Sequence, residues 1–215
     1  MTISSTSHDT SLEVLAVSPV IPVVVLQDAQ QALPLAEALL SGGVGIIEVT
    51  LRTEAGLDAI ARIARALPEM LVGAGTVITR DQASAAEQAG ARFVVTPGSP
   101  ATLVDAVLTA GLPLLAGAST LTEIMMLIER GHRAVKFFPA EQAGGVEYLR
   151  AVHDPLPQAV FCPTGGIIPA TAEDYLALPN VSCVGGSWLT PAGVCAAGDW
   201  ATVQQLAHEA STLGS

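Results

Sequence analysis

The chain alternates between short apolar runs and longer stretches with a helical pattern, and this alternation restricts its fold more than any other feature. Eight runs begin at intervals of 19 to 26 residues. Most are hydrophobic over nearly their whole length, which is typical of strands buried on both faces of a parallel sheet. The expected strands are 20–26, 45–51, 71–77, 93–98, 112–118, 134–139, 159–164 and 182–187.

The stretches between the runs predict helices, several of which end at a glycine or before a proline, as helices commonly do. A strand–helix unit repeated eight times predicts the α/β class and a single (β/α)8 TIM barrel, with an open α/β sheet as the alternative. The clearest expected helices are 28–40, 54–67, 79–89, 100–110 and 120–130.

The ends and the length of the chain complete this picture. No linker or change of composition interrupts the repeats, so we expect one domain over residues 11–215. Residues 1–10 are predicted to be a disordered tail, and residues 11–17 a short helix that covers the N-terminal end of the barrel.

Composition excludes several classes of partner. The net charge of −11 and the lack of a basic cluster argue against nucleic acid and anionic membranes, but a small phosphorylated ligand can still bind through backbone amides. The N-terminal segment does not resemble a secretory signal, and no stretch has the length of a membrane span. Three cysteines without metal-ligand spacing are expected to be reduced, in a cytoplasmic protein.

Lys136 is the only lysine, and it lies inside an apolar run while eight arginines carry the other positive charges. An arginine has the same charge but cannot be deprotonated to attack a carbonyl. Partial desolvation favours the neutral amine, so the position indicates a nucleophile. The alternative is a lysine that extends its charged end to the surface at the end of a strand, in a chain that generally favours arginine.

Strand alternation places Glu48 and Arg52 on one face of the run 45–51 and its extension. In a parallel barrel the outer face is covered by helices, so both side chains are expected to point into the barrel mouth, where such barrels have their active sites. Lys136 points to the same lumen if Ala134 points inward. The alternative for Glu48 and Arg52 is a structural ion pair.

Two glycine pairs, Gly165-Gly166 and Gly185-Gly186, close the last two runs. Glycines let backbone N–H groups approach an anion closely, and many barrels bind phosphate after strands seven and eight. The alternative is that glycine only fits tight barrel corners.

Five motifs resemble the class I 2-keto-3-deoxy-6-phosphogluconate (KDPG) aldolases, which also act as 4-hydroxy-2-oxoglutarate (KHG) aldolases. The match runs from about Val20 to Ala210 with almost unchanged spacing. The sequence differs around Ala118-Ser119-Thr120 and at Gln142-Ala143, where no catalytic group is lost. The motifs are EVTLRTE at 48–54, VGAGTV at 72–77, KFFPAE at 136–141, FCPTGGI at 161–167 and GGSW at 185–188.

The resemblance implies a homotrimer that cleaves the phosphorylated keto acid to pyruvate and glyceraldehyde 3-phosphate, and KHG to pyruvate and glyoxylate, without a metal or cofactor. It assigns Lys136 to the Schiff base and Glu48 to proton transfer. Arg52 and Thr76 would bind the pyruvate carboxylate, Pro97 and Phe138 would wall the pyruvate pocket, and Thr164 would contact the substrate. The implied phosphate ligands are Gly165, Gly166, Gly185, Gly186 and Ser187.

Two other functions fit the same barrel. A phosphosugar isomerase or epimerase would use Glu48 as a base without a covalent step, and the buried lysine argues against it. A non-catalytic scaffold would have no need to keep Lys136, Glu48 and Arg52 together.

Overall fold

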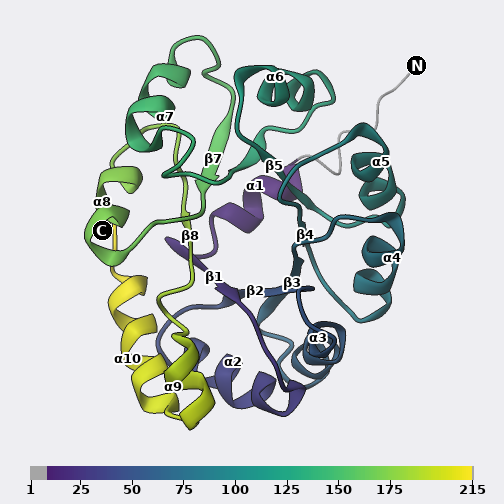
Figure 1. The fold of residues 1–215 in the computed structure, drawn as a ribbon, viewed down its shortest axis with the longest axis vertical. Helices are drawn as coiled ribbons and strands as arrows, with labels where there is room; N and C mark the ends of the chain where they lie inside the picture. Colours follow the sequence, from purple (N-terminus) through teal and green to yellow (C-terminus); the bar gives the residue numbers. More distant parts are fainter. Residues whose placement is uncertain (1–8, 215) are drawn as a thin grey trace.

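The computed structural model describes residues 9–214, which form a ring of parallel strands surrounded by helices (Figure 1). The strands follow one another around the ring in chain order, and β8 pairs with β1. They are β1 (Val20–Val24), β2 (Ile46–Thr50), β3 (Leu71–Gly75), β4 (Val94–Val95), β5 (Leu114–Ala118), β6 (Ala134–Phe137), β7 (Val160–Pro163) and β8 (Val184–Gly186).

The ring closes between β7 and β8 through isolated bridges. Phe161 pairs with Val181, and Thr164 pairs with Gly185. The backbone N–H of Ser182 donates to the carbonyl of Phe161 over 3.1 Å. The predicted barrel is therefore confirmed, and the open sheet is not what the chain forms.

Helices cover the outside of the ring, and four of the five predicted from sequence agree with the structure within about a residue at each end. The predicted helix 28–40 is instead divided into the 3-10 turn η1 and the helix α2, which begins at Ala32. Thr79 and Thr120 each cap a following helix through a reciprocal hydrogen-bonded box, which explains the sharp starts of α4 and α6. The helical elements after β1 are η1 (Ala29–Gln31), α2 (Ala32–Ser41), α3 (Ala55–Ala66), α4 (Arg80–Gln88), α5 (Ala101–Thr109), α6 (Leu121–Glu129), α7 (Gly145–His153), α8 (Pro169–Leu176), α9 (Ala192–Ala197) and α10 (Trp200–Ser211).

All eight strands are shorter than the apolar runs that predicted them, and β4 is shortened most. The run 93–98 yields only Val94–Val95, and the run 112–118 pairs only from Leu114. Pro97 and Pro113 lack a backbone N–H, so the hydrogen-bonded ladder cannot include a donor at either position.

The helix α1 (Asp9–Leu15) covers the N-terminal end of the barrel, as predicted, and crosses the ring in Figure 1. The Ser11 hydroxyl accepts from the backbone N–H of Leu114 at the start of β5, and the Ser182 hydroxyl donates to the carbonyl of Leu15. The helix begins at Asp9 rather than at residue 11 and ends two residues earlier than expected. Most of the predicted tail 1–10 lies outside the described residues.

The barrel interior is closely packed because glycines in the strands admit large neighbours. A Cβ atom on Gly73 of β3 would overlap the ring of Phe93, a fully buried side chain. Large side chains such as Phe93 therefore fill the barrel interior, which leaves the C-terminal strand ends as the place for a site. Within residues 9–214, no helix is long and apolar enough to cross a membrane.

Candidate active site

Lys136 and Glu48 form the centre of the site, where they meet across the barrel from β6 and β2. The Lys136 ammonium nitrogen lies 3.2 Å from Oε1 and 3.4 Å from Oε2 of Glu48. The two side chains are 5% and 3% exposed. A buried charge pair of this kind is a poor source of stability, because desolvation offsets most of the attraction, and such pairs are therefore candidates for function.

Glycines beside the pair leave room for it. A Cβ atom on Gly75 of β3 would overlap the carboxylate of Glu48, so this position must be glycine if Glu48 is to reach Lys136. On the other side, Gly117 is the register partner of Lys136 in β5, and a Cβ there would overlap the backbone of Pro97. The loop after β4 therefore lies directly beside the lysine strand.

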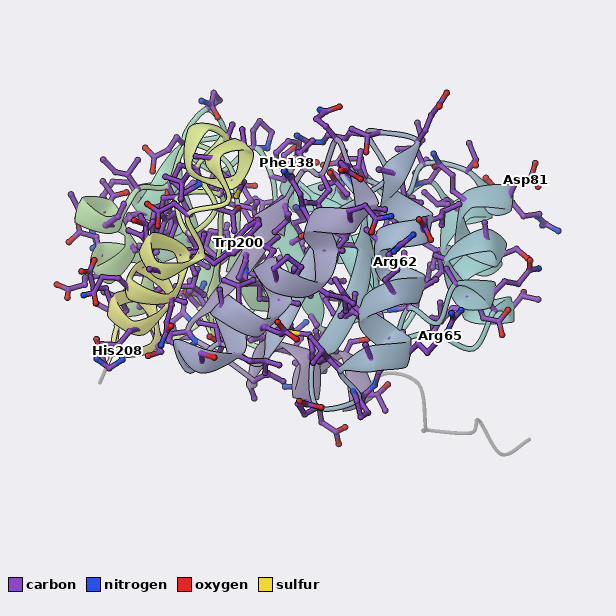
Figure 2. All side chains as sticks on the ribbon, turned by 90° about the horizontal axis from the view of Figure 1, so that it is seen from below. Arg62, Arg65, Asp81, Phe138, Trp200 and His208 are labelled. Atoms are coloured by element: carbon purple, nitrogen blue, oxygen red, sulfur yellow. The ribbon has the colours of Figure 1, made fainter. Side chains whose placement is uncertain are left out.

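Phe138 and Arg52 lie at the mouth of the barrel, above the charged pair. The Phe138 ring centroid is 5.5 Å from the Lys136 nitrogen, within the range of a cation–π contact. In Figure 2 Phe138 lies at the edge of the molecule opposite α1, which is the end where the strands terminate. Arg52 donates from Nε to the Thr76 hydroxyl over 3.1 Å.

Thr76 has a left-handed backbone conformation, with φ of 57°. This conformation is uncommon for a β-branched residue and costs free energy, and such residues concentrate at functional sites. Here it follows directly after β3 and brings the Thr76 hydroxyl to Arg52. The pair offers a guanidinium and a hydroxyl next to the buried charges.

A cavity of about 250 Å³ opens at the ends of β7 and β8, next to Arg52 and Phe138. Gly165 and Gly166 both have positive φ, at 104° and 82°, so the loop after β7 depends on glycine. The cavity lining contains Val23, Val25, Arg52, Phe138, Thr164, Gly165, Gly166, Ile167, Gly185 and Ser187. A larger hollow of about 690 Å³, between α7 and α8 on the outside of the barrel, contains none of the predicted site residues.

Gly185 and Gly186 differ in their surroundings, although the sequence made them look alike. A Cβ on Gly185 would overlap the hydroxyl of Thr164, so glycine at 185 lets Thr164 face the cavity. A Cβ on Gly186 would instead overlap the indole of Trp188. Gly186 is not among the cavity residues, and the side of its α-carbon is occupied by Trp188 rather than open to a ligand.

The predicted site residues thus lie in different places in the structure. Lys136 and Glu48 form the buried pair, and Arg52 and Thr76 are hydrogen-bonded to each other. Pro97 is half-buried beside Gly117 and is not among the cavity residues. The cavity brings together Arg52, Phe138, Thr164, Gly165, Gly166, Gly185 and Ser187.

Two alternatives from the sequence are not what the chain forms. Lys136 does not extend to the surface, because it is 4% exposed. The partner of Glu48 is Lys136, and a Glu48–Arg52 pair is absent from the ion pairs of residues 9–214.

Sequence reasoning missed Val23, Val25 and Ile167, which complete the cavity lining. Val23 and Val25 are two residues apart in the run 20–26, so the alternation used for the second strand would have identified them together. Ile167 directly follows the glycine pair, and no pattern in the sequence distinguishes it.

Comparison with known proteins identifies the family. A family model for KDPG and KHG aldolase matches residues 12–206. The chain belongs to this family. The Escherichia coli K12 protein named KHG/KDPG aldolase is 48% identical over 92% of each chain.

Solved structures of other members have the same fold as this aldolase-family chain. The KDPG aldolase of Legionella pneumophila, with pyruvate captured as a covalent carbinolamine, has a TM-score of 0.92 and is 43% identical, covering 94% of this chain and 98% of its own. The Zymomonas mobilis enzyme with 3-phosphoglycerate has a TM-score of 0.91 and is 41% identical, with 96% and 97% covered.

Proposed function

We propose that this chain is a class I aldolase that cleaves KDPG to pyruvate and glyceraldehyde 3-phosphate, and KHG to pyruvate and glyoxylate. The observation that carries the proposal is the buried contact between the only lysine and Glu48, in a chain of the KDPG and KHG aldolase family. The related Legionella structure with a carbinolamine of pyruvate supports a covalent route.

In the first stage the Lys136 amine attacks C2 of the keto acid. The carbonyl oxygen takes a proton, and the resulting carbinolamine loses water to form an iminium ion. Glu48 is within 3.2 Å of the lysine nitrogen, so it can take the ammonium proton before attack and return a proton to the departing hydroxyl.

In the second stage the C3–C4 bond breaks. Its electron pair moves into the iminium and gives an enamine, while Glu48 takes the proton of the C4 hydroxyl as that carbon becomes an aldehyde. Protonation of the enamine at C3 and hydrolysis of the imine then release pyruvate and the free lysine. A proton-transfer group of this kind typically contributes about 10²–10⁴-fold in rate.

The pyruvate part of the substrate is assigned to Arg52, Thr76, Pro97 and Phe138. Arg52 offers a planar guanidinium that can bind a carboxylate through two hydrogen bonds, and the Thr76 hydroxyl fixes its direction. Phe138 walls the pocket beside the lysine nitrogen. Pro97 contributes to the wall through the loop that contacts Gly117.

The phosphate is assigned to the corner after β7 and β8, with Gly165, Gly166, Gly185, Gly186 and Ser187 as ligands and Thr164 facing the substrate chain. The sequence has no lysine or arginine after Arg150, so the two strand ends themselves can offer only backbone N–H groups and hydroxyls. Gly186 would take part only through its backbone, because Trp188 covers its α-carbon.

We also propose a homotrimer in the cytoplasm, with residues 11–215 as one aldolase domain. Sedimentation equilibrium of the purified protein tests the trimer. A mass of one or two protomers at micromolar concentration would reject it.

Borohydride reduction in the presence of pyruvate tests the covalent mechanism. Since Lys136 is the only lysine, one adduct should form and map to residues 134–139. The matched control is Lys136→Arg, which retains the charge and should give no adduct in the strand. Active enzyme without modified Lys136 would reject the mechanism and favour the isomerase or epimerase alternative, in which Glu48 acts alone.

A further inference from the structure

The loop that follows β6 rests on the loop that follows β7. The backbone N–H of Ala140 donates to the carbonyl of Thr164 over 2.8 Å, and that of Glu141 donates to the carbonyl of Gly165 over 3.1 Å. Glu141 is therefore fixed next to the corner proposed to hold the substrate phosphate. It is exposed, and nothing in the proposed reaction uses it.

The stem and the carboxylate of Glu141 face different neighbours. Its Cγ and Cβ lie 2.6 and 2.8 Å from the point where a Cβ of Gly166 would be, and the next nearest atom is Nε2 of Gln142 at 3.7 Å. The carboxylate atoms are therefore no closer than 3.7 Å to that Cβ position. One of them, Oε1, accepts a hydrogen bond of 2.6 Å from the hydroxyl of Tyr175.

Tyr175 is a rigid donor for this contact. It belongs to α8 and is fully buried, and its hydroxyl lies 3.2 Å from the Cβ position of Gly145 at the start of α7. Figure 1 shows α7 and α8 next to each other on the outside of the ring. Burial and, second, the Glu141 hydrogen bond raise the pKa of Tyr175, so its hydroxyl remains a donor.

The position of this carboxylate has an electrostatic consequence. Among the described residues that line the cavity, Arg52 is the only one with a positive charge. One guanidinium and neutral backbone N–H groups leave part of the phosphate charge uncompensated, so a carboxylate that turned toward Gly166 would repel the phosphate. Binding of a phosphorylated ligand requires that Glu141 be directed elsewhere.

We propose that Tyr175 is a positioning residue of the phosphate site, which holds the Glu141 carboxylate outward, between α7 and α8, and away from Gly165 and Gly166. The inference rests on the proposed function, because it takes the phosphate to bind at this corner. The stem of Glu141 supports the glycine loop, while its charge is turned away from the ligand. KHG has no phosphate, so its binding does not depend on the direction of the Glu141 carboxylate.

The test compares Tyr175→Phe, Glu141→Gln and the double variant on both substrates. Tyr175→Phe frees the carboxylate and should raise KM for KDPG by about threefold to tenfold, with kcat and the KM for KHG unchanged. Glu141→Gln should leave KM for KDPG equal or lower. The double variant should return KM for KDPG to near the wild-type value, because an amide does not repel phosphate.

Salt and a second binding measurement separate this role from a structural one. The KM increase in Tyr175→Phe should shrink as sodium chloride is raised, since the repulsion is screened. Calorimetric titration with inorganic phosphate should show the same order of affinities without turnover. The matched control is Tyr148→Phe, which removes the other tyrosine hydroxyl of the chain, from a ring stacked on Phe137, and should leave both KM values unchanged.

Several outcomes would overturn the inference. They are an equal rise of KM for both substrates in Tyr175→Phe, no rise at all, or a double variant as impaired as Tyr175→Phe. Wild-type protein that cleaves neither substrate but binds phosphate in the expected order would instead reject the proposed function and leave the positioning role intact.

Discussion

The two halves of the site differ in the groups that form them. The Lys136–Glu48 centre consists of charged side chains, 5% and 3% exposed, in the packed interior of the barrel. The corner after β7 and β8 consists mainly of glycine backbone and exposed Ser187 around a cavity. Charges that perform chemistry benefit from a dry, fixed setting, whereas amides that bind a charged group must be reachable from solvent.

Glycine serves both halves, for different reasons. At Gly75 and Gly185 the missing side chain makes space for a neighbour, the Glu48 carboxylate or the Thr164 hydroxyl. At Gly165 and Gly166 the backbone itself requires glycine, because φ is positive. In the proposed function, the first kind makes room for the reacting side chains, and the second shapes the loop that binds phosphate. Substitutions in the first half should therefore affect both substrates, whereas substitutions in the second half should affect mainly KDPG.

The largest effect is expected from Lys136→Arg. The variant retains a positive charge opposite Glu48 but cannot form an imine, so kcat should fall on the order of 10⁴-fold or more for both substrates. Steady-state rates with KDPG and KHG measure it, and a circular dichroism melt checks folding. A fall in kcat for only one substrate would show that the two substrates do not react at the same charged centre.

Glu48→Gln should lower kcat by about 10²–10⁴-fold for both substrates while the Lys136 imine still forms. The amide keeps the shape of the side chain but cannot accept the C4 hydroxyl proton. Rates are measured beside borohydride trapping with pyruvate. Near-normal turnover would mean that a group other than Glu48 transfers the proton.

Gly166→Ala should raise KM for KDPG by about tenfold, because an alanine is strained at φ of 82° and its Cβ would press on Glu141. KM for KHG should change little. The matched control is Gly193→Ala, where a Cβ meets nothing within 4 Å. Equal weakening of both substrates would mean that the glycine loop is a packing device and that phosphate binds elsewhere.

The smallest expected effect is on the free energy of unfolding, not on catalysis, and comes from Glu123 at the start of α6. Hydrogen bonds from Ser119 and Thr120 lower the pKa of Glu123, with the Ser119 backbone as the largest cause. A lowered pKa in the folded state gives stability that is present above the usual value of 4.5 and is lost as pH falls through the lower folded value. Glu123 is mostly exposed, so the contribution is below about 1 kcal/mol.

Urea unfolding of Glu123→Gln at several pH values measures this contribution. The variant should be less stable than the wild type at pH 7, and the difference should disappear in acid. Turnover of both substrates should stay unchanged at pH 7. A difference that does not depend on pH would mean that packing, and not the carboxylate charge, is responsible.

The sequence predicted the barrel and the direction of the Lys136 and Glu48 side chains because these depend on periodicity. Alternation in the run 45–51 was sufficient to point Glu48 inward, and strand repeats were sufficient to place Lys136 at the same end. The contact between them spans 88 positions of the chain. It depends on the closure of the ring and on the absence of a side chain at Gly75, which periodicity cannot give.

Other features depend on contacts that leave no local pattern. Nothing around Thr76 indicates a left-handed backbone, since the usual signal is a glycine or asparagine at that position. The two glycine pairs look equivalent in sequence, but Trp188 packs on Gly186 and not on Gly185. The hydrogen bond between Glu141 and Tyr175 joins the loop after β6 to α8 across 34 positions of the chain, and residue spacing does not reveal it.

The burial of Lys136 gives the protein an unusual response to amine-directed reagents. Every other cationic side chain is an arginine or a histidine, so activated esters and aldehyde cross-linkers can acylate or bridge only the α-amino group and this one ε-amine. Lys136 lies in the strand interior at 4% exposure, so a fluorescent ester must enter through the barrel mouth to react. Coupling to that amine, and its protection by pyruvate, would report occupancy of the site directly, without a mutation to remove competing lysines.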